Sequence, residues 1–259
     1  MSIMIDPTAH VGANTRWGEF CVVGANVDVG PDCEIGHHVV LAPGTVIGAG
    51  VRIDDGAVIG KKPMRAANTA VTKEQDLPPA RVGDGAIIGT HVVIYRGAVL
   101  GARVLVADLA TVRENVTIGD FTIVGRGVAI ENFCTIGRYC KLETNVYITA
   151  YSKLGDRVFV APGALTSNDN FIGRTEERFK HFKGVTVGRG ARIGVGAVIL
   201  PGKTVADDAL VAAGAVLTGD APARMIVAGV PAKPFREVPP EQLLDAQIWP
   251  DVKDARGPE

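Results

Sequence analysis

A six-residue period dominates this sequence and constrains its fold more than any other feature. Counted in hexads from Ile5, the chain gives thirty units in three uninterrupted blocks, and Val, Ile or Leu occupies the first position in 29 of them, Trp17 being the exception. The fifth position is small or β-branched almost throughout, with Pro63 and Lys203 as exceptions. A period of six fits neither an α-helix nor a plain alternating strand. It predicts short strands whose inward residues occupy positions five and one, joined by corners at positions three and four.

Three such strands make one triangular turn, and stacked turns are separated by the spacing of paired strands, about 4.8 Å. The sequence therefore predicts an all-β solenoid of about ten turns. Glycine usage agrees with this prediction, because 16 of the 32 glycines fall at position two and 11 at position four, on either side of the corners.

Two segments, 61–81 and 167–186, interrupt the period. A solenoid accepts insertions at its corners, where loops often build a binding face. The second insertion is rich in charge, with Arg174, Arg178, Lys180, His181 and Lys183 set against Asp169, Glu176 and Glu177. We interpret it as a loop that contacts anionic phosphates or a neighbouring subunit, the alternative being a solvated excursion. The predicted units are a solenoid over 1–222 and a C-terminal cap over 223–259, with a short helix at Pro240–Ile248.

Composition excludes several classes of protein. The net charge of −1 argues against nucleic-acid binding over the whole chain, and no apolar run is long enough for a membrane span. No charged-then-apolar N-terminal signal is present, so a cytoplasmic location is expected. The four cysteines all fall at the small inward position and are predicted to be buried, inert thiols: Cys21, Cys33, Cys134 and Cys140.

One face of the predicted prism lacks the usual glycine at position two. On four successive turns it carries Tyr95, Arg113, Glu131 and Thr149 instead, and the next residue in this column is Ser167, at the start of the second insertion. We expect a functional site along this polar column. Two simpler interpretations are a hydrogen-bonded subunit interface and a plain Arg113–Glu131 pair.

The hexad pattern resembles that of the hexapeptide-repeat acyltransferases over residues 5 to about 222. The resemblance implies a left-handed parallel β-helix, a homotrimer with sites between subunits, and acetyl-CoA as donor. The string AGVPAKPFRE, 228–237, resembles a segment that closes the β-helix near the coenzyme A nucleotide in that family. The cofactor-binding residues it implies are Lys233 and Arg236, and the small residues Gly196, Ala197, Gly214 and Ala215 are expected to let a pantetheine arm approach the backbone. A purely structural role of glycine at a tight corner is equally compatible with the pattern there.

Two branches of this family share further strings with the chain. IGKKPM and the re-entry after the first insertion resemble UDP-N-acetylglucosamine acyltransferases of lipid A synthesis, but Glu114 stands where those enzymes carry a catalytic His. Residues 140–148 and 158–168 resemble nucleotide-sugar N-acetyltransferases, with Asn145 on a polar Asn of that group and Glu143 in place of a Gln.

The function that the sequence predicts is coenzyme A-dependent N-acetylation of a nucleotide-linked amino sugar. The candidate catalytic residues are Asn145, Glu143, Asp169 and Glu114. The candidate substrate-binding residues are Tyr147, Asn168, Asn170, Arg174, His181 and His91. No metal is expected, because the five histidines do not reproduce the three-His pattern of a γ-type carbonic anhydrase. Three rival hypotheses stay open: acyl-carrier-protein-dependent acyl transfer, a γ-type carbonic anhydrase and a non-catalytic scaffold.

Overall fold

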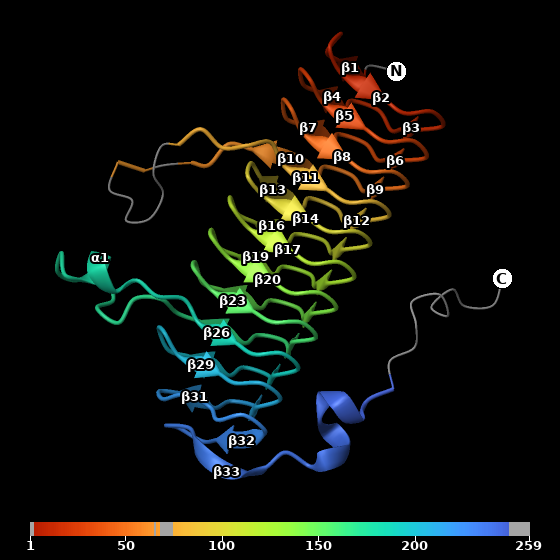
Figure 1. Ribbon diagram of the computed structural model, residues 1–259. Coiled ribbons are helices and arrows are strands. Elements are labelled where there is room, and N and C mark those ends of the chain that lie inside the picture. Colours follow the sequence, from red (N-terminus) through yellow and green to blue (C-terminus); the bar gives the residue numbers. More distant parts are fainter. Residues whose placement is uncertain (1–2, 65, 68–74, 249–259) are drawn as a thin grey trace.

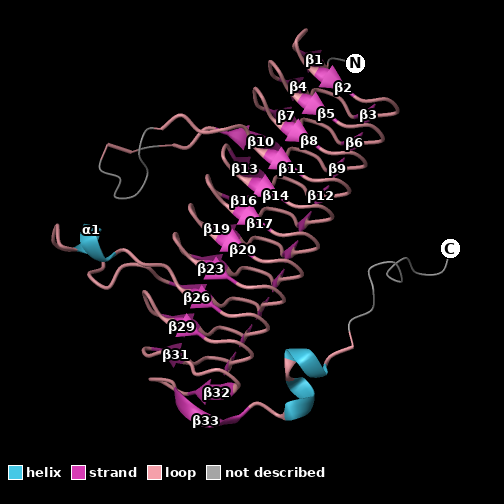
Figure 2. Ribbon diagram, in the orientation of Figure 1, coloured by secondary structure: helices cyan, strands magenta, loops and turns pink. Residues whose placement is uncertain are grey.

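The computed structural model describes residues 3–64, 66–67 and 75–248, and it shows a parallel β-solenoid built from three sheets (Figures 1 and 2). Sheet A contains β1 (Met4–Ile5), β4 (Val22–Val23), β7 (Val40–Leu41), β10 (Val58–Lys61), β13 (Val93–Tyr95), β16 (Thr111–Val112), β19 (Ala129–Ile130), β22 (Tyr147–Ile148), β25 (Leu165–Thr166), β28 (Val198–Ile199) and β31 (Val216–Leu217). Sheet B contains β2 (His10–Val11), β5 (Asp28–Val29), β8 (Val46–Ile47), β11 (Arg81–Val82), β14 (Val99–Leu100), β17 (Thr117–Ile118), β20 (Thr135–Ile136), β23 (Lys153–Leu154), β26 (Thr186–Val187) and β29 (Thr204–Val205).

Sheet C is the largest of the three. It contains β3 (Arg16–Trp17), β6 (Glu34–Ile35), β9 (Arg52–Ile53), β12 (Ile87–Ile88), β15 (Leu105–Val106), β18 (Ile123–Val124), β21 (Lys141–Leu142), β24 (Phe159–Val160), β27 (Arg192–Ile193), β30 (Leu210–Val211), β32 (Met225–Ala228) and β33 (Lys233–Glu237). The predicted fold class is confirmed. The expected count of about ten turns was slightly low, because the sheets hold 11, 10 and 12 strands.

The core is a narrow column of aliphatic side chains from positions one and five. Ile130 pairs in register with Ile148 on the next turn, and both are almost fully buried, as is Cys134 at position five. Burial raises the pKa of the Cys134 thiol to about 12 and that of Cys140 to about 11. The thiols are therefore protonated near neutral pH, which agrees with their predicted inert role.

The corners are tight because successive turns stack closely. A Cβ added to Gly119 at position two would lie 2.7 Å from the backbone nitrogen of Arg138 on the next turn, so only glycine fits there. Position four adopts a left-handed conformation, with φ of 56° at Asn115 and 66° at Gly127. Asn and Gly tolerate this region best, which explains their use at the corners.

Aspartates at the corners tie neighbouring turns together. The Oδ1 atom of Asp156 accepts the backbone N–H of Arg138 on the preceding turn at 2.8 Å, and Asp120 and Asp207 accept from Ala102 and Arg189 in the same way. Each such bond satisfies a backbone N–H group that makes no hydrogen bond in strand pairing.

Both insertions leave the solenoid at the same corner, where sheet A passes to sheet B. The first departs after β10 and returns at β11, and the second departs after β25 and returns at β26. In Figure 1 they project to one side of the rod. The guanidinium of Arg96 fixes the return of the first insertion by donating to the carbonyl of Leu77, at 3.2 Å from Nε, and to that of Pro43, at 2.8 Å from Nη1.

The C-terminal cap differs from the prediction. β32 still adds to sheet C in parallel, and β33 turns back antiparallel to it. The single helix expected at Pro240–Ile248 is wrong: two 3₁₀ turns, η1 (Pro240–Gln242) and η2 (Leu244–Ala246), flank an extended Leu243. The physical reason is that Asp208 Oδ1 captures the Leu244 amide at 2.9 Å, whereas a continuous helix would direct that amide to its own backbone.

We expect Asp156→Ala to lower the free energy of unfolding by about 1 kcal/mol, the value of one lost hydrogen bond to a backbone amide. Urea denaturation followed by circular dichroism measures the change. Asp28→Ala is the matched control, because Asp28 is exposed on sheet B and the same charge is removed there. Equal stability of the two variants would show that the corner aspartates do not hold the turns together.

Candidate active site

The polar column lies at the corner that follows sheet A, on the four turns between the two insertions. Its position-two residues are Tyr95, Arg113, Glu131 and Thr149. Tyr95 is the last residue of β13, and the other three directly follow β16, β19 and β22. Because these strands pair in register, each column residue lies one turn above the next. The fold thus stacks the polar side chains along one edge of the rod.

An ion cluster of one cation and two carboxylates forms the centre of this column. Arg113 donates to Glu114 through Nε at 2.9 Å and Nη2 at 3.1 Å, and to Glu131 through Nη1 at 3.2 Å. Its guanidinium also lies 5.0 Å from the centre of the Tyr95 ring. The expected Arg113–Glu131 pair is confirmed, and the buried Glu114 is the stronger, bidentate partner.

The two carboxylates of this cluster differ in their surroundings. Burial raises the pKa of Glu131 above its ordinary value, Arg113 opposes this, and the charge of Glu114 adds to it. Glu114 takes two of the Arg113 nitrogens and is fully buried, whereas the Glu131 side chain keeps a 25% exposed fraction. Glu131 is therefore the carboxylate of the cluster that can exchange a proton with a bound molecule.

Glu131 faces a hollow of about 230 Å³ at the base of the second insertion. The other lining residues come from the last turn before the insertion and from the insertion itself: Tyr147, Thr149, Ala150, Asn168, Asp169, Arg178 and Phe182. Burial, and then the charge of Glu131, raise the pKa of the Tyr147 hydroxyl, so this group stays protonated near neutral pH. The hollow thus combines two carboxylates, a phenol, an amide and a guanidinium.

Asp169 holds the second insertion in place. Its carboxylate accepts the backbone N–H groups of Phe171 at 2.9 Å and Gly173 at 3.0 Å, and Arg178 Nη2 lies 3.1 Å from Oδ2. Burial acts to raise its pKa, but these hydrogen bonds and Arg178 outweigh it and lower the pKa. Asp169 is therefore an ionised anchor of the loop.

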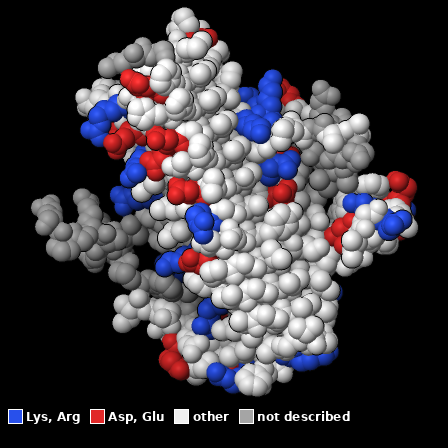
Figure 3. Space-filling model, turned by 180° about the vertical axis from the view of Figure 1, so that it is seen from behind, with Lys and Arg blue, Asp and Glu red and all other residues white. Residues whose placement is uncertain are grey.

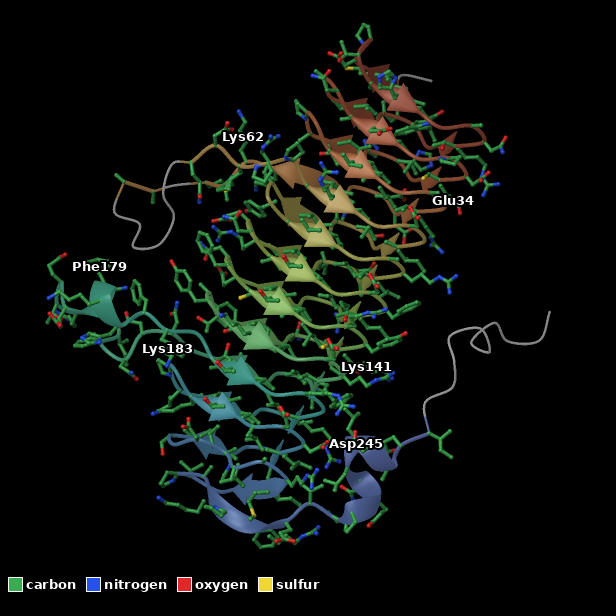
Figure 4. The ribbon with its side chains drawn as sticks, viewed as in Figure 1. Glu34, Lys62, Lys141, Phe179, Lys183 and Asp245 are labelled. Atoms are coloured by element: carbon green, nitrogen blue, oxygen red, sulfur yellow. The ribbon has the colours of Figure 1, made fainter. Side chains whose placement is uncertain are left out.

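Arg178 begins the short helix α1 (Arg178–His181) and turns back toward the solenoid. Its guanidinium lies 5.2 Å from the ring centre of Phe182 and 5.4 Å from that of Phe179. Figure 4 places Phe179 on the projecting part of the insertion and Lys183 where the chain returns to the rod. The hollow is thus lined both by the base of the insertion, at Asn168 and Asp169, and by Arg178 and Phe182 at the two ends of α1.

The structure brings together only some of the predicted residues. Tyr147, Asn168 and Asp169 line the hollow, and Glu114 adjoins it through Arg113. The other predicted residues of the insertion, Asn170, Arg174 and His181, are exposed and lie outside the lining, and the His181 imidazole lies 3.0 Å from Glu177.

Glu143, Asn145 and His91 lie at a different corner, between sheets C and A. Asn145 has a φ of 59° and its amide oxygen rests against Gly127 of the preceding turn, so it adopts the corner conformation that asparagine favours. His91 has the same backbone conformation, with a φ of 55°. Within the chain, these residues are separated from Glu131 by the width of sheet A.

Sequence reasoning did not single out Phe182 for the site and did not predict that Asn132, at the same corner as Glu131, is buried. The sequence signal that could have identified Phe182 is that aromatic residues are rare in this chain. Asn132 follows Glu131 and is 1% exposed, and its amide atoms have no hydrogen-bond partner among the described residues. Nothing in the hexad pattern distinguishes a buried asparagine at this corner from an exposed one.

The predicted cofactor residues lie on the C-terminal turns. Gly196 and Gly214 occupy corners between sheets C and A, where a Cβ would meet no atom within 4 Å, while Ala197 and Ala215 are buried in the core. Lys233 and Arg236 are exposed on β33. Their roles toward coenzyme A stay predictions.

Apart from Lys61, at the end of β10, the outward residues of sheet A are uncharged. Its outward residues are Met4, Val22, Val40, Val58, Val93, Thr111, Ala129, Tyr147, Leu165, Val198 and Val216. Figure 3 shows, on the rear of the molecule, a broad area without charged side chains between a charged edge and the second insertion. Because Tyr147 lies on this face, the hollow opens at its edge.

The part of the chain that the structure describes holds no group of three or more His, Cys, Asp or Glu side chains placed so that they could bind a metal ion. No described helix has the length and apolar character that crossing a membrane requires.

Comparison with known families identifies the repeat. Residues 8–43 match the family described as bacterial transferase hexapeptide (six repeats), and residues 184–219 match the hexapeptide repeat of succinyl-transferase. Near both ends of its solenoid, the chain thus carries the hexapeptide repeat of bacterial transferases.

Curated relatives match over short stretches. A galactoside O-acetyltransferase of Escherichia coli is 39% identical over 54 residues, which is 21% of this chain and 27% of that protein. A 2,3,4,5-tetrahydropyridine-2,6-dicarboxylate N-acetyltransferase of Enterococcus faecalis is 39% identical over 61 residues, 24% of this chain and 26% of that protein. The matched part spans about a quarter of each relative.

The fold extends this likeness over most of the chain. A UDP-N-acetylglucosamine O-acyltransferase structure from Moraxella catarrhalis superimposes with a TM-score of 0.50 at 20% identity, covering 91% of this chain and 73% of that one. At this identity, the likeness is one of fold.

We expect Asp169→Ala to loosen the second insertion without unfolding the solenoid, because the loop loses its three anchoring contacts. Limited trypsin digestion with mass spectrometry should show faster cleavage after Arg174, Arg178, Lys180 and Lys183, while the melting temperature stays nearly unchanged. Glu176→Ala, an exposed residue of the same insertion, is the control. Equal cleavage rates in wild type and Asp169→Ala would contradict the anchoring role.

Proposed function

We propose that the protein is an acyltransferase that moves an acetyl group from acetyl-CoA to the amine of a nucleotide-linked amino sugar. One observation carries the proposal: Glu131, a carboxylate with a raised pKa, faces a polar hollow at the corner from which both insertions leave. The presence of transferase hexapeptide repeats in the same chain, and of acetyltransferases among its relatives, supports acyl transfer as the chemistry.

The reaction requires the protein mainly to position the amine and the thioester and to provide a proton acceptor. The neutral amine attacks the thioester carbonyl, a C–N bond forms, and the C–S bond breaks as the thiolate of coenzyme A leaves. Glu131 accepts the proton that the amine nitrogen loses, and that proton is released to the thiolate or to water. A carboxylate whose pKa is raised suits this role better than an ordinary one. Tyr147 and the amide of Asn168 lie in the hollow as donors for the sugar or the developing oxyanion.

The second insertion supplies groups for a nucleotide diphosphate. Arg178 lies in the hollow, and Arg174 and His181 extend the same loop outward. An arginine fork fits phosphate oxygens in a bidentate manner. In this proposal Asp169 orients Arg178 and is a positioning residue, and Asn170 belongs to the exposed end of the acceptor site.

A homotrimer would complete the site across the uncharged face of sheet A. Packing this face against a second copy would place the corner of Glu143, Asn145 and His91 of one subunit near the hollow of its neighbour. Gly196 and Gly214 lie on that same corner, where a pantetheine arm can approach the backbone. Lys233 and Arg236 would then meet phosphates of the donor.

Transfer to a hydroxyl group is the second candidate. It is supported by the O-acetyltransferase among the relatives. The two candidates differ in the acceptor that supports turnover. A hydroxyl acceptor also needs a stronger base than a neutral amine does.

Thiol release from acetyl-CoA, measured with a panel of UDP- and dTDP-linked amino sugars and their hydroxyl analogues, tests this function. We expect release with one or more amino sugars. An acidic limb in the pH profile of kcat/KM should report a pKa above the ordinary glutamate value, because Glu131 must be ionised to accept a proton.

Glu131→Gln should remove that limb and lower kcat/KM by about 100-fold, in the range of lost general-base catalysis. Glu34→Gln, on the exposed face of sheet C, is the control and should keep the wild-type profile. Release with hydroxyl sugars alone would replace the amine proposal by the second candidate. An unchanged profile in Glu131→Gln would move the base elsewhere.

The proposed trimer predicts a mass three times the 27.1 kDa of one chain in light scattering after size exclusion. Val198→Glu places a charge on the outer face of sheet A and should give monomers, because a buried unpaired carboxylate opposes association. Thr204→Glu, on the outer face of sheet B one strand later, should leave the trimer intact. A wild-type protein of monomeric mass would contradict the interface.

A further inference from the structure

A second hollow lies at the other side of the rod, between the C-terminal cap and sheet C. It has a volume of about 230 Å³, and its polar lining includes Arg157, Arg192, Asp208, Glu241 and Gln242. Figure 1 shows the cap on the side opposite to the two insertions, and Figure 4 labels Asp245 there. The hollow is therefore separate from the site at the polar column.

Arg192 occupies an unusual position in this hollow. It points outward from β27, in a column of sheet C whose neighbours are Phe159 on one side and Leu210 on the other. The cap covers it and supplies one contact, from Nη1 to the amide oxygen of Gln242 at 3.1 Å. Its Nη2 atom is buried and has no hydrogen-bond partner among the described residues. A cation between two apolar neighbours, with an unused donor, favours a further acceptor.

The cap is positioned so that the Asp208 carboxylate does not supply this acceptor. Asp208 Oδ1 accepts the Leu244 amide at 2.9 Å, and no ion pair joins Asp208 to Arg192 within the described chain. Gly190 is needed for this seating, because a Cβ there would lie 2.7 Å from Asp208 Oδ1 and 3.0 Å from Leu244. Burial lowers the pKa of Arg192, with Asp208 only partly opposing it, which agrees with incomplete pairing.

We propose that this hollow is a binding site for a small anion, a phosphate or carboxylate group, held by the guanidinium of Arg192. The volume is below the range of about 300–1,000 Å³ for sites that enclose a whole ligand, so it suits a single anionic group. Arg157 lines the same hollow and adds positive charge, while Phe159 provides an apolar wall. Glu241 also lines the hollow and opposes an anion by charge.

Inorganic phosphate, titrated into the full chain by calorimetry at constant ionic strength, tests the site without any activity measurement. We expect saturable binding that weakens at least about tenfold in Arg192→Met, the loss of one charge-assisted hydrogen bond. Glu241→Gln should bind phosphate about twofold to fivefold more tightly, because a nearby like charge is removed. Arg103→Met removes the same charge at an exposed corner several turns away and should bind phosphate as wild type does.

A second measurement, of the melting temperature, distinguishes a loss of binding from a folding defect. Arg192→Met should melt no lower than wild type without phosphate, because it removes a buried, incompletely paired cation. Millimolar phosphate should raise the melting temperature of wild type but not that of the variant. An equal rise in both would be the general effect of an excluded salt and would overturn the proposal.

The source of the anion is distinguished by a parallel titration with adenosine 3′,5′-bisphosphate. Tighter binding than free phosphate, lost in Arg192→Met, assigns the site to a phosphate of a larger nucleotide. Equal affinity for both assigns it to a free anion. Absence of binding by either probe, or binding that Arg192→Met does not weaken, would overturn the site.

Discussion

The parallel register between successive turns is the constraint on which the rest of this structure depends. Each strand pairs with the strand one turn later, so every inward aliphatic side chain meets a similar one above and below it. The strands are mostly two residues long and could not exist alone, because a single short pair buries too little apolar surface to offset its ordering. Stability comes from repetition, as in other solenoids whose units contact only their neighbours. A one-residue slip would turn the core column outward, so the register is strictly held.

This same constraint explains what the sequence could predict. Columns of residues one turn apart follow directly from the hexads, and they correctly stacked Tyr95, Arg113, Glu131 and Thr149 on one corner. The break points at 61–81 and 167–186 lie close to where the chain leaves the rod, after β10 and after β25. These are consequences of periodicity, which a single sequence displays in full.

The features that the sequence did not predict are those that depend on single, non-periodic contacts. The path of the second insertion is set by Asp169 and its bonds to Phe171, Gly173 and Arg178, and no spacing rule encodes them. The cap formed two 3₁₀ turns instead of one helix because Asp208, more than thirty residues earlier, captures the Leu244 amide. Motif likeness grouped Asn145 with Asp169, although sheet A separates their corners. Only the proposed packing of a second subunit would bring those two edges together.

The architecture of the rod also explains why a buried charged side chain indicates a binding site. A triangular core of mostly aliphatic side chains leaves no room for charged groups, so corners and sheet faces carry the charges, mostly in contact with water. Two places depart from this rule. At the polar column, Arg113 is held between the buried Glu114 and the partly exposed Glu131, and the cluster keeps one carboxylate more than it can neutralise. Under the cap, Arg192 has a donor without a partner in the described chain. The first place has a carboxylate that can accept a proton from an amine, whereas the second lacks an acceptor and suits an anion. Because each arrangement is less favourable for the protein alone than an apolar one would be, both point to molecules that the rod binds rather than to its own stability.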